Sequence, residues 1–197
     1  MKLKLLTAAI ATSALLVTGL FAADKKMGMD KMADKKMGME KMAEMPFGGL
    51  NDVAYSKSLW AKIEAKGLNS TPANLYVGGP PHGPVREVLE GMIDGKRVIV
   101  KRNYGGKGVS LEAVAKDRAK YLKAVTVMLK MDKGYDTKNN DWFWVKYKAD
   151  GTLHATPKGD KIAGKFPGCI ACHSSASGSD LVFAHNKEAN AAVVYVK

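Results

Sequence analysis

The sequence predicts an α+β domain that is mainly an antiparallel β-sheet with a few peripheral helices. Stretches between residues 85 and 147 alternate β-branched or aromatic side chains with polar ones, which is the period of a strand with one buried face. The turn signals Asp94-Gly95 and Asp150-Gly151 join neighbouring stretches. Consecutive strands joined by short turns usually pair antiparallel, so a meander is the simplest topology.

The elements follow from this pattern in chain order. Asp52 is the expected cap of a first helix, which presents apolar residues at helical spacing and ends near Gly67. A second, shorter helix is expected at 111–118, and a proline- and glycine-rich turn at 78–84. The expected strands are 85–89, 97–104, 124–130 and 141–147.

The first 23 residues have the pattern of a secretory signal peptide. A basic start is followed by an apolar run at 5–21 and by the small residues Ala22-Ala23. A membrane anchor is the weaker interpretation, because the run is short and the flank after it is polar. We therefore expect the mature protein in the periplasm.

Residues 24–46 form a low-complexity arm, an imperfect repeat rich in methionine and lysine. Such a segment buries too little surface to fold alone, so we expect a mobile arm or a partly helical tether. Its clustered thioethers suit Cu(I), and the alternative is a spacer that contacts a membrane or a partner. The folded domain is expected at 47–197.

The formal net charge of +12 makes the chain strongly basic. A basic surface can steer acidic redox partners or anionic substrates, although a solvated lysine coat is the simpler interpretation. A nucleic-acid partner is not expected, because the chain is predicted to be exported and shows no basic-aromatic surface.

The segment Cys169-Ile170-Ala171-Cys172-His173 is a C-x-x-C-H motif, the attachment signature of haem c. In this arrangement the thiols form thioethers with the haem vinyl groups, and the histidine supplies an axial imidazole to iron. We therefore predict one covalently bound haem c. Cys169 and Cys172 would hold it, and His173 would be the metal ligand.

Two other uses of the motif fit less well. A zinc site needs two further ligands at matching spacing, and the chain has only 2 cysteines. A thioredoxin-like pair normally opens a helix after a strand, whereas this pair follows Phe166-Pro167-Gly168.

The residues around the motif favour an iron with an open or weakly held sixth position. The last methionine is Met131, so no methionine can return from downstream, and His185 is the only later histidine. Upstream residues could still cap the iron, although core packing is the default interpretation of the methionines. These candidates are Met92, Met128, Met131 and His82.

Several separated motifs resemble the cytochrome P-460 family. The similarity lies at 141–151, 168–174 and 179–185, and in the same order upstream at 81–86 and 93–101. The resemblance implies a small, largely antiparallel fold, a homodimer and a five-coordinate haem c. Some members oxidise hydroxylamine, alone or with nitric oxide, and pass electrons to an external acceptor such as a soluble cytochrome. The related cytochromes c′-beta bind nitric oxide.

The family is known for a lysine whose side-chain nitrogen is bonded to a meso carbon of the porphyrin. The matching motif here points to Lys101, although the c′-beta branch lacks this bond. On a strand beginning at Arg97, Lys101 shares a face with Ile99, and an inward lysine would be desolvated and more nucleophilic. The alternative is an exposed lysine on an edge strand.

The resemblance also suggests two catalytic residues. Arg86 matches an arginine on the distal side, where a cation can orient a nitrogenous ligand, and its alternative is a surface arginine. The oxidising members place a carboxylate before the haem motif. Asp160 is the nearest candidate here, because the stretch 156–162 has no glutamate. Phe143 and Phe183 either wall the haem pocket or pack in the core.

Three functions remain open from the sequence. The first is a hydroxylamine oxidoreductase-like haem enzyme that acts on hydroxylamine or nitric oxide at a five-coordinate iron. The second is a non-enzymatic nitric oxide binder of the c′-beta type. The third is a simple electron-transfer cytochrome c with a strong sixth ligand.

Overall fold

The computed structural model describes residues 31–40, 45–183 and 192–197. The chain divides into two compact units, Met1–Glu40 and Lys41–Lys197. In the first unit, residues 31–40 are helical with exposed side chains. The predicted signal peptide, parts of the predicted arm and His185 lie outside the described residues. Within the described ranges, no helix has both the length and the apolar character needed to cross a membrane.

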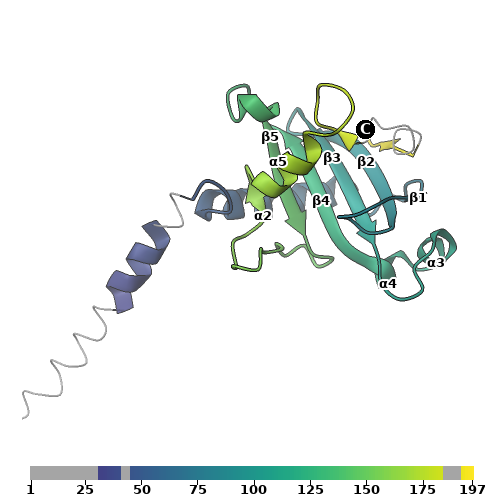
Figure 1. Cartoon of the computed structure of the whole chain (residues 1–197), viewed down its shortest axis with the longest axis horizontal. Helices are drawn as coiled ribbons and strands as arrows, with labels where there is room; N and C mark the ends of the chain where they lie inside the picture. The colour runs from purple at the N-terminus through teal and green to yellow at the C-terminus, as the bar shows by residue number, and fades with distance from the viewer. Residues whose placement is uncertain (1–30, 41–44, 184–191) are drawn as a thin grey trace, which may run out of the picture. The chain divides into compact units, whose positions relative to one another are not determined.

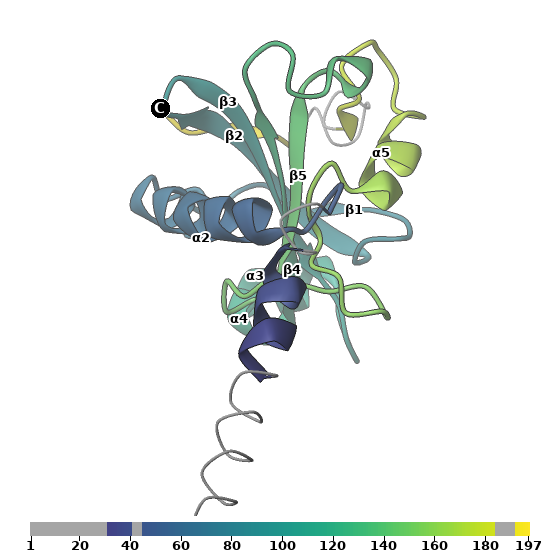
Figure 2. The ribbon, with the colours of Figure 1, turned by 90° about the vertical axis from the view of Figure 1, so that its left-hand side faces the viewer.

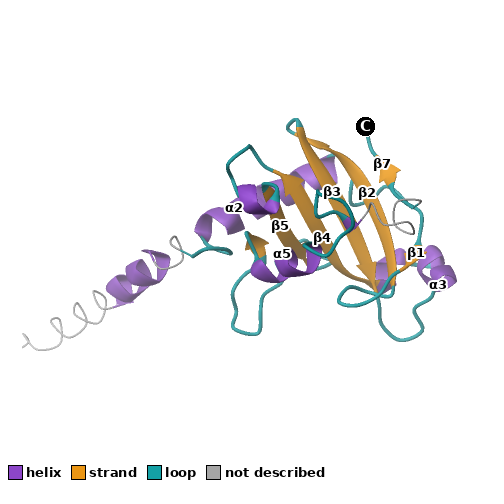
Figure 3. Cartoon of the chain, turned by 45° about the horizontal axis from the view of Figure 1, so that its top comes forward, coloured by secondary structure: helices purple, strands orange, loops and turns teal. Residues whose placement is uncertain are grey.

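The second unit is built on a seven-stranded sheet of described residues. Its strands are orange in Figure 3. Neighbours in the order β1-β2-β3-β4-β5-β6 pair antiparallel, and β7 pairs parallel with β2. The predicted antiparallel α+β fold is therefore confirmed. The strands are β1 (Tyr76–Val77), β2 (Val85–Ile93), β3 (Lys96–Tyr104), β4 (Leu122–Lys130), β5 (Trp142–Tyr147), β6 (Ala163–Gly164) and β7 (Val194–Tyr195).

Short helices and one longer helix surround the sheet (Figure 1). The longer helix, α2, packs Leu59 and Ile63 against the sheet, and both side chains are buried as their spacing predicts. The helices are α2 (Leu50–Ala65), α3 (Leu111–Lys116), α4 (Arg118–Tyr121), the 3₁₀ turn η1 (Thr137–Asn139) and α5 (Pro167–His173).

Several boundaries differ from the prediction, and three of the differences have a clear physical reason. Helix α2 begins at Leu50 after the N-cap Gly49, and Asp52 lies in its first turn, where the helix dipole favours a carboxylate. The predicted helix 111–118 divides at Asp117, which leaves the helical region and accepts the Lys120 N–H to cap α4. Strand β2 runs on to Ile93, because the next two residues have φ of 50° and 74° and form a two-residue hairpin turn.

The sheet presents two chemically different faces. In β3, Val98 and Val100 belong to the apolar cluster that packs under α2, whereas Ile99 belongs to a second cluster with Met128 and Trp144. This alternation follows the period of two that the sequence predicts. Figure 2 views the sheet nearly edge-on, with α2 on one side and α5 on the other.

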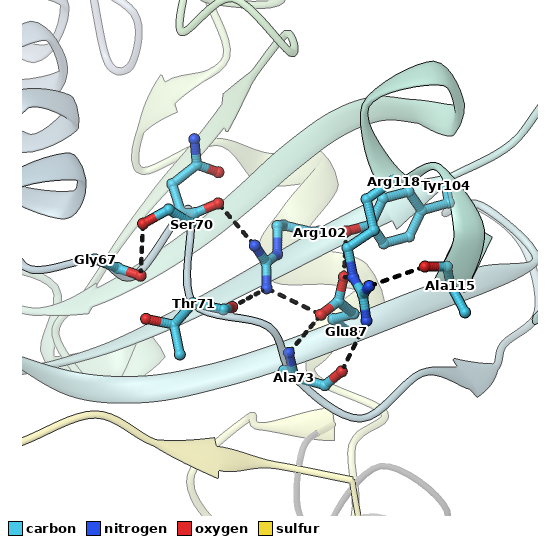
Figure 4. A network of polar contacts seen from close by, with 10 residues as sticks. Gly67, Ser70, Thr71, Ala73, Glu87, Arg102, Tyr104, Ala115 and Arg118 are labelled. Carbon is cyan, nitrogen blue, oxygen red and sulfur yellow. Dashed lines mark hydrogen bonds and ion pairs between the residues drawn. The ribbon is translucent and has the colours of Figure 1, made fainter.

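A buried carboxylate, Glu87, joins β2 to its surroundings on the α2 side of the sheet (Figure 4). Its oxygens accept hydrogen bonds from Arg102 at 2.9 Å, from Arg118 at 2.9 Å and from the Tyr104 hydroxyl. They also accept the Ala73 N–H at 2.6 Å. Glu87 is fully buried and Arg102 is only 4% exposed, so each charge depends on the other for compensation.

We expect Glu87→Ala to lower the free energy of unfolding by about 3–5 kcal/mol, because it leaves the Arg102 guanidinium buried without its counter-ion. Urea unfolding followed by far-UV circular dichroism measures this loss. Asp94→Asn, which removes a carboxylate paired with the exposed Lys62, is the matched control and should leave the midpoint unchanged. Equal midpoints for Glu87→Ala and the parent would contradict the assignment.

Candidate functional site

Helix α5 carries the C-x-x-C-H motif. Phe166 precedes it as N-cap and Pro167 takes the first helical position, where a missing N–H costs nothing. Residues three apart lie on the same side of a helix, so Cys169 and Cys172 are presented together, and His173 follows in the last turn. The 7 residues of α5 form about two helical turns.

Between α5 and the facing side of the sheet lies a cavity with about 880 Å³ of empty space, part of it open to solvent. Both motif cysteines and His173 line it. Most of its other walls are apolar, which suits a flat hydrophobic group. The apolar walls come from Ile99, Met128, Trp144, Phe166, Val182 and Phe183.

The His173 imidazole is fixed in one tautomer. Its Nδ1 lies 2.8 Å from the carbonyl oxygen of Leu181, and a carbonyl can only accept, so Nδ1 carries the proton and Nε2 offers its lone pair. The ring packs edge-on against Trp144 and Phe183, with centroids 4.7 and 5.0 Å away. Burial lowers the pKa of His173 to about 4, so the ring is neutral and able to bind a metal at physiological pH.

The two cysteines are free thiols. Burial raises the pKa of Cys169 to about 12, which is the opposite of the low pKa of a reactive redox cysteine. Across the described part of the chain, no group of three or more histidine, cysteine, aspartate or glutamate side chains could hold a metal ion, so nothing there completes a zinc site. Two thiols and one neutral imidazole on an apolar cavity fit the needs of haem c.

Lys101 lines the same cavity and is only 7% exposed. It lies on β3, which is flanked by β2 and β4, so the alternative of an exposed edge-strand lysine is wrong. Among the described residues, no acidic side chain forms an ion pair with its Nζ. Burial, together with the charge of Arg86, lowers the pKa of Lys101 to about 8.

Arg86 lies beside the cavity rather than in its wall. It is on β2 and shares the cavity side of the sheet with Val88, which pairs with Lys101. Its Nε donates to the Gly83 carbonyl at 3.0 Å, and its Nη2 is buried without a hydrogen-bond partner in the described structure. Its charge nevertheless reaches both Lys101 and His82 and lowers the pKa of each.

Asp160 lies in a turn outside the cavity-lining set. Its carboxylate accepts a hydrogen bond from the Thr156 hydroxyl at 3.3 Å. Its backbone N–H donates to the oxygen of that Thr156 hydroxyl at 3.2 Å. These contacts stabilise the turn itself. The structure therefore does not bring Asp160 together with the motif.

Only some of the candidate sixth ligands of the iron line the cavity. His82 and Met128 line the cavity, whereas Met92 is 53% exposed and Met131 packs against the α2-side cluster. Burial, then the charges of Lys101 and Arg86, lowers the pKa of His82 to about 3, so this imidazole is neutral.

The two phenylalanines that were candidates for the cavity wall lie in different places. Phe183 lines the cavity, and Phe143 belongs to the α2-side core. The sequence alone did not single out Thr126, Trp144 and Lys146 as wall residues. They are cross-strand neighbours of cavity-side residues, so the strand register was the missing signal.

The family model of cytochrome P-460 matches residues 88–184, which span most of the sheet, the cavity wall and α5. No curated protein matches the chain, and no solved structure matches it either. The matched segment contains the attachment motif, the histidine with a free Nε2 and the buried lysine. The chain therefore belongs to the cytochrome P-460 family and is a haem c cytochrome of that family.

Proposed function

We propose that this cytochrome, with its haem held by Cys169, Cys172 and His173, would bind hydroxylamine or nitric oxide at the iron and oxidise hydroxylamine. The observation that carries the proposal is the buried amine of Lys101 in the wall of the haem cavity, without an acidic partner in the described structure. The electrons would pass to an external acceptor such as a soluble cytochrome. Export to the periplasm is part of the proposal and rests on the predicted signal peptide.

The apolar and the polar residues of the cavity wall have different roles in binding a small polar ligand. When bound, the haem iron supplies a Lewis-acid site and accepts electrons. The apolar walls exclude water from this site, which strengthens every polar contact inside it. Lys101 supplies a buried amine in the cavity wall that can hydrogen-bond a bound N–O group, and the neutral His82 can accept or donate a proton in the same space.

The proposal extends to a covalent bond between Lys101 Nζ and a porphyrin carbon. A desolvated amine without a counter-ion is a better nucleophile than an exposed one. Forming the bond removes one N–H and one C–H hydrogen as two protons and two electrons, so it needs a two-electron oxidant such as a peroxide. The support is the position of Lys101 in the cavity and the family resemblance.

An electron-transfer cytochrome is the second candidate, because His82 and Met128 both line the cavity and either could cap the iron. A non-enzymatic nitric oxide binder shares the vacant iron face of the main proposal but lacks turnover.

Replacing both thiols should abolish covalent haem. We expect Cys169→Ala/Cys172→Ala to lose haem-dependent staining on a denaturing gel, because no thioether remains. Ser174→Ala, one residue beyond the motif, should stain like the parent. Full staining of the double variant would contradict the assignment of these two residues.

Carbon monoxide binding distinguishes a vacant iron face from a capped one. We expect a high-spin spectrum and prompt binding of carbon monoxide by the reduced protein. A low-spin spectrum that resists carbon monoxide would instead support the electron carrier. In that event, recovery of binding in His82→Ala or in Met128→Leu identifies the capping ligand.

Removing the Lys101 amine should impair turnover. We expect Lys101→Met to lower kcat for hydroxylamine oxidation with a dye acceptor by about 100-fold, because the variant loses a buried hydrogen-bond donor to the bound N–O group. Peptide mass spectrometry of the parent should show haem attached to Lys101, and the broad, red-shifted Soret band should disappear in the variant. Lys146→Met, a second lysine of the cavity wall, is the matched control and should retain activity. Parent-like turnover by Lys101→Met would overturn the role.

A further inference from the structure

The segment that follows α5 orients the histidine of the motif. The Leu181 carbonyl accepts the Nδ1–H of His173 at 2.8 Å, as described above. Leu181 has φ of +59°, in the left-handed region that a leucine rarely adopts. A residue held in such a conformation persists only where its neighbours fix it. The position of this carbonyl therefore depends on contacts outside the residue itself.

Asp180, the preceding residue, supplies those contacts to three strands. Arg97 of β3 donates from Nη1 to its carboxylate at 2.6 Å, and Lys130 of β4 donates at 3.3 Å. Trp142 of β5 donates its indole N–H to the Asp180 backbone carbonyl at 2.9 Å. The Asp180 carboxylate and backbone are thus attached to the cavity side of the sheet.

The cations that hold Asp180 are themselves fixed. Glu90 accepts two hydrogen bonds from Arg97, at 2.5 Å from Nε and 3.0 Å from Nη2. Arg97 and Lys130 both lie over the Trp142 ring, 5.7 and 4.6 Å from its centroid. The Arg97 and Asp180 side chains are only 27% and 30% exposed, so solvent screens this pair less than a fully exposed one.

We propose that Asp180 is a positioning residue for His173. Its carboxylate, held by Arg97 and Lys130, fixes the Leu181 carbonyl as the acceptor of the His173 Nδ1–H, and so sets how strongly Nε2 donates to the haem iron. The proposal rests on the haem c of the family and not on hydroxylamine turnover.

The physical effect runs through the imidazole. A strong acceptor at Nδ1 makes the ring more basic at Nε2, and a more basic axial ligand stabilises ferric over ferrous iron. If Asp180 loses its contacts with Arg97 and Lys130, Leu181 can relax out of the left-handed region. Its carbonyl can then move away from the His173 Nδ1. The iron–histidine bond then weakens and the reduction potential rises.

The test uses the haem-loaded protein carrying Asp180→Asn, which keeps the size of the side chain and removes its charge. Resonance Raman spectroscopy of the ferrous form should show the iron–histidine stretching band at lower frequency than in the parent. Redox titration should show a higher reduction potential. Neither measurement requires hydroxylamine or nitric oxide, so a failure here is distinguishable from a failure of the proposed function.

Asp132→Asn is the matched control. It removes one negative charge two residues beyond Lys130, where Asp132 pairs with Lys96, and leaves Asp180 in contact with Arg97 and Lys130. A through-space charge effect would raise the potential of both variants and leave the iron–histidine band of both unchanged. The proposal requires a band shift in Asp180→Asn that Asp132→Asn does not show.

Lys130→Gln covers the case in which Asp180→Asn does not load haem. It removes one of the two cations and should shift the band in the same direction by a smaller amount. An unchanged band in whichever of these variants carries haem, with native circular dichroism, would overturn the proposal.

Discussion

The alternation of side chains along β3, β4 and β5 is the constraint on which the rest of the molecule depends. Because successive residues of a strand point to opposite faces, the same three strands supply an apolar layer under α2 and a mixed wall for the cavity. A slip of one residue would exchange the two sets and move Lys101 into the core under α2. The register of these strands therefore holds the fold and the site together.

A buried charged side chain is compensated by partners on the α2 side of the sheet but not on the cavity side. On the α2 side, Glu87 is met by Arg102, Arg118, the Tyr104 hydroxyl and a backbone N–H, so the network compensates its own burial. On the cavity side, Lys101 is almost as buried but has no acidic partner in the described structure. A buried carboxylate that is paired with two cations indicates a structural role, whereas an uncompensated amine beside a cavity indicates a role toward a ligand.

The haem motif is local in sequence, but its surroundings are not. Helix α5 presents two thiols and the imidazole within seven residues, so the local helix sets their spacing. The hydrogen bond that sets the tautomer of His173 comes from Leu181, and the segment around Leu181 is held by strands far earlier in the chain. Arg97 and Asp180, for example, are 83 positions apart. The orientation of the His173 ring thus depends on long-range contacts, although the attachment motif itself is short.

The sequence by itself determined the attachment motif, the antiparallel fold class and the fact that Lys101 shares a strand face with Ile99. Each of these depends on residue spacing, which a linear sequence contains in full. Only the tertiary structure decided that Asp160 lies outside the cavity, that Met92 is exposed while Met128 and His82 reach the site, and that Asp180 holds the Leu181 segment. The two-residue strands and the divided helix at Asp117 were also beyond prediction, because such short elements show no measurable period. Contacts between distant segments depend on strand register and loop closure, and neither is encoded in the spacing of neighbouring residues.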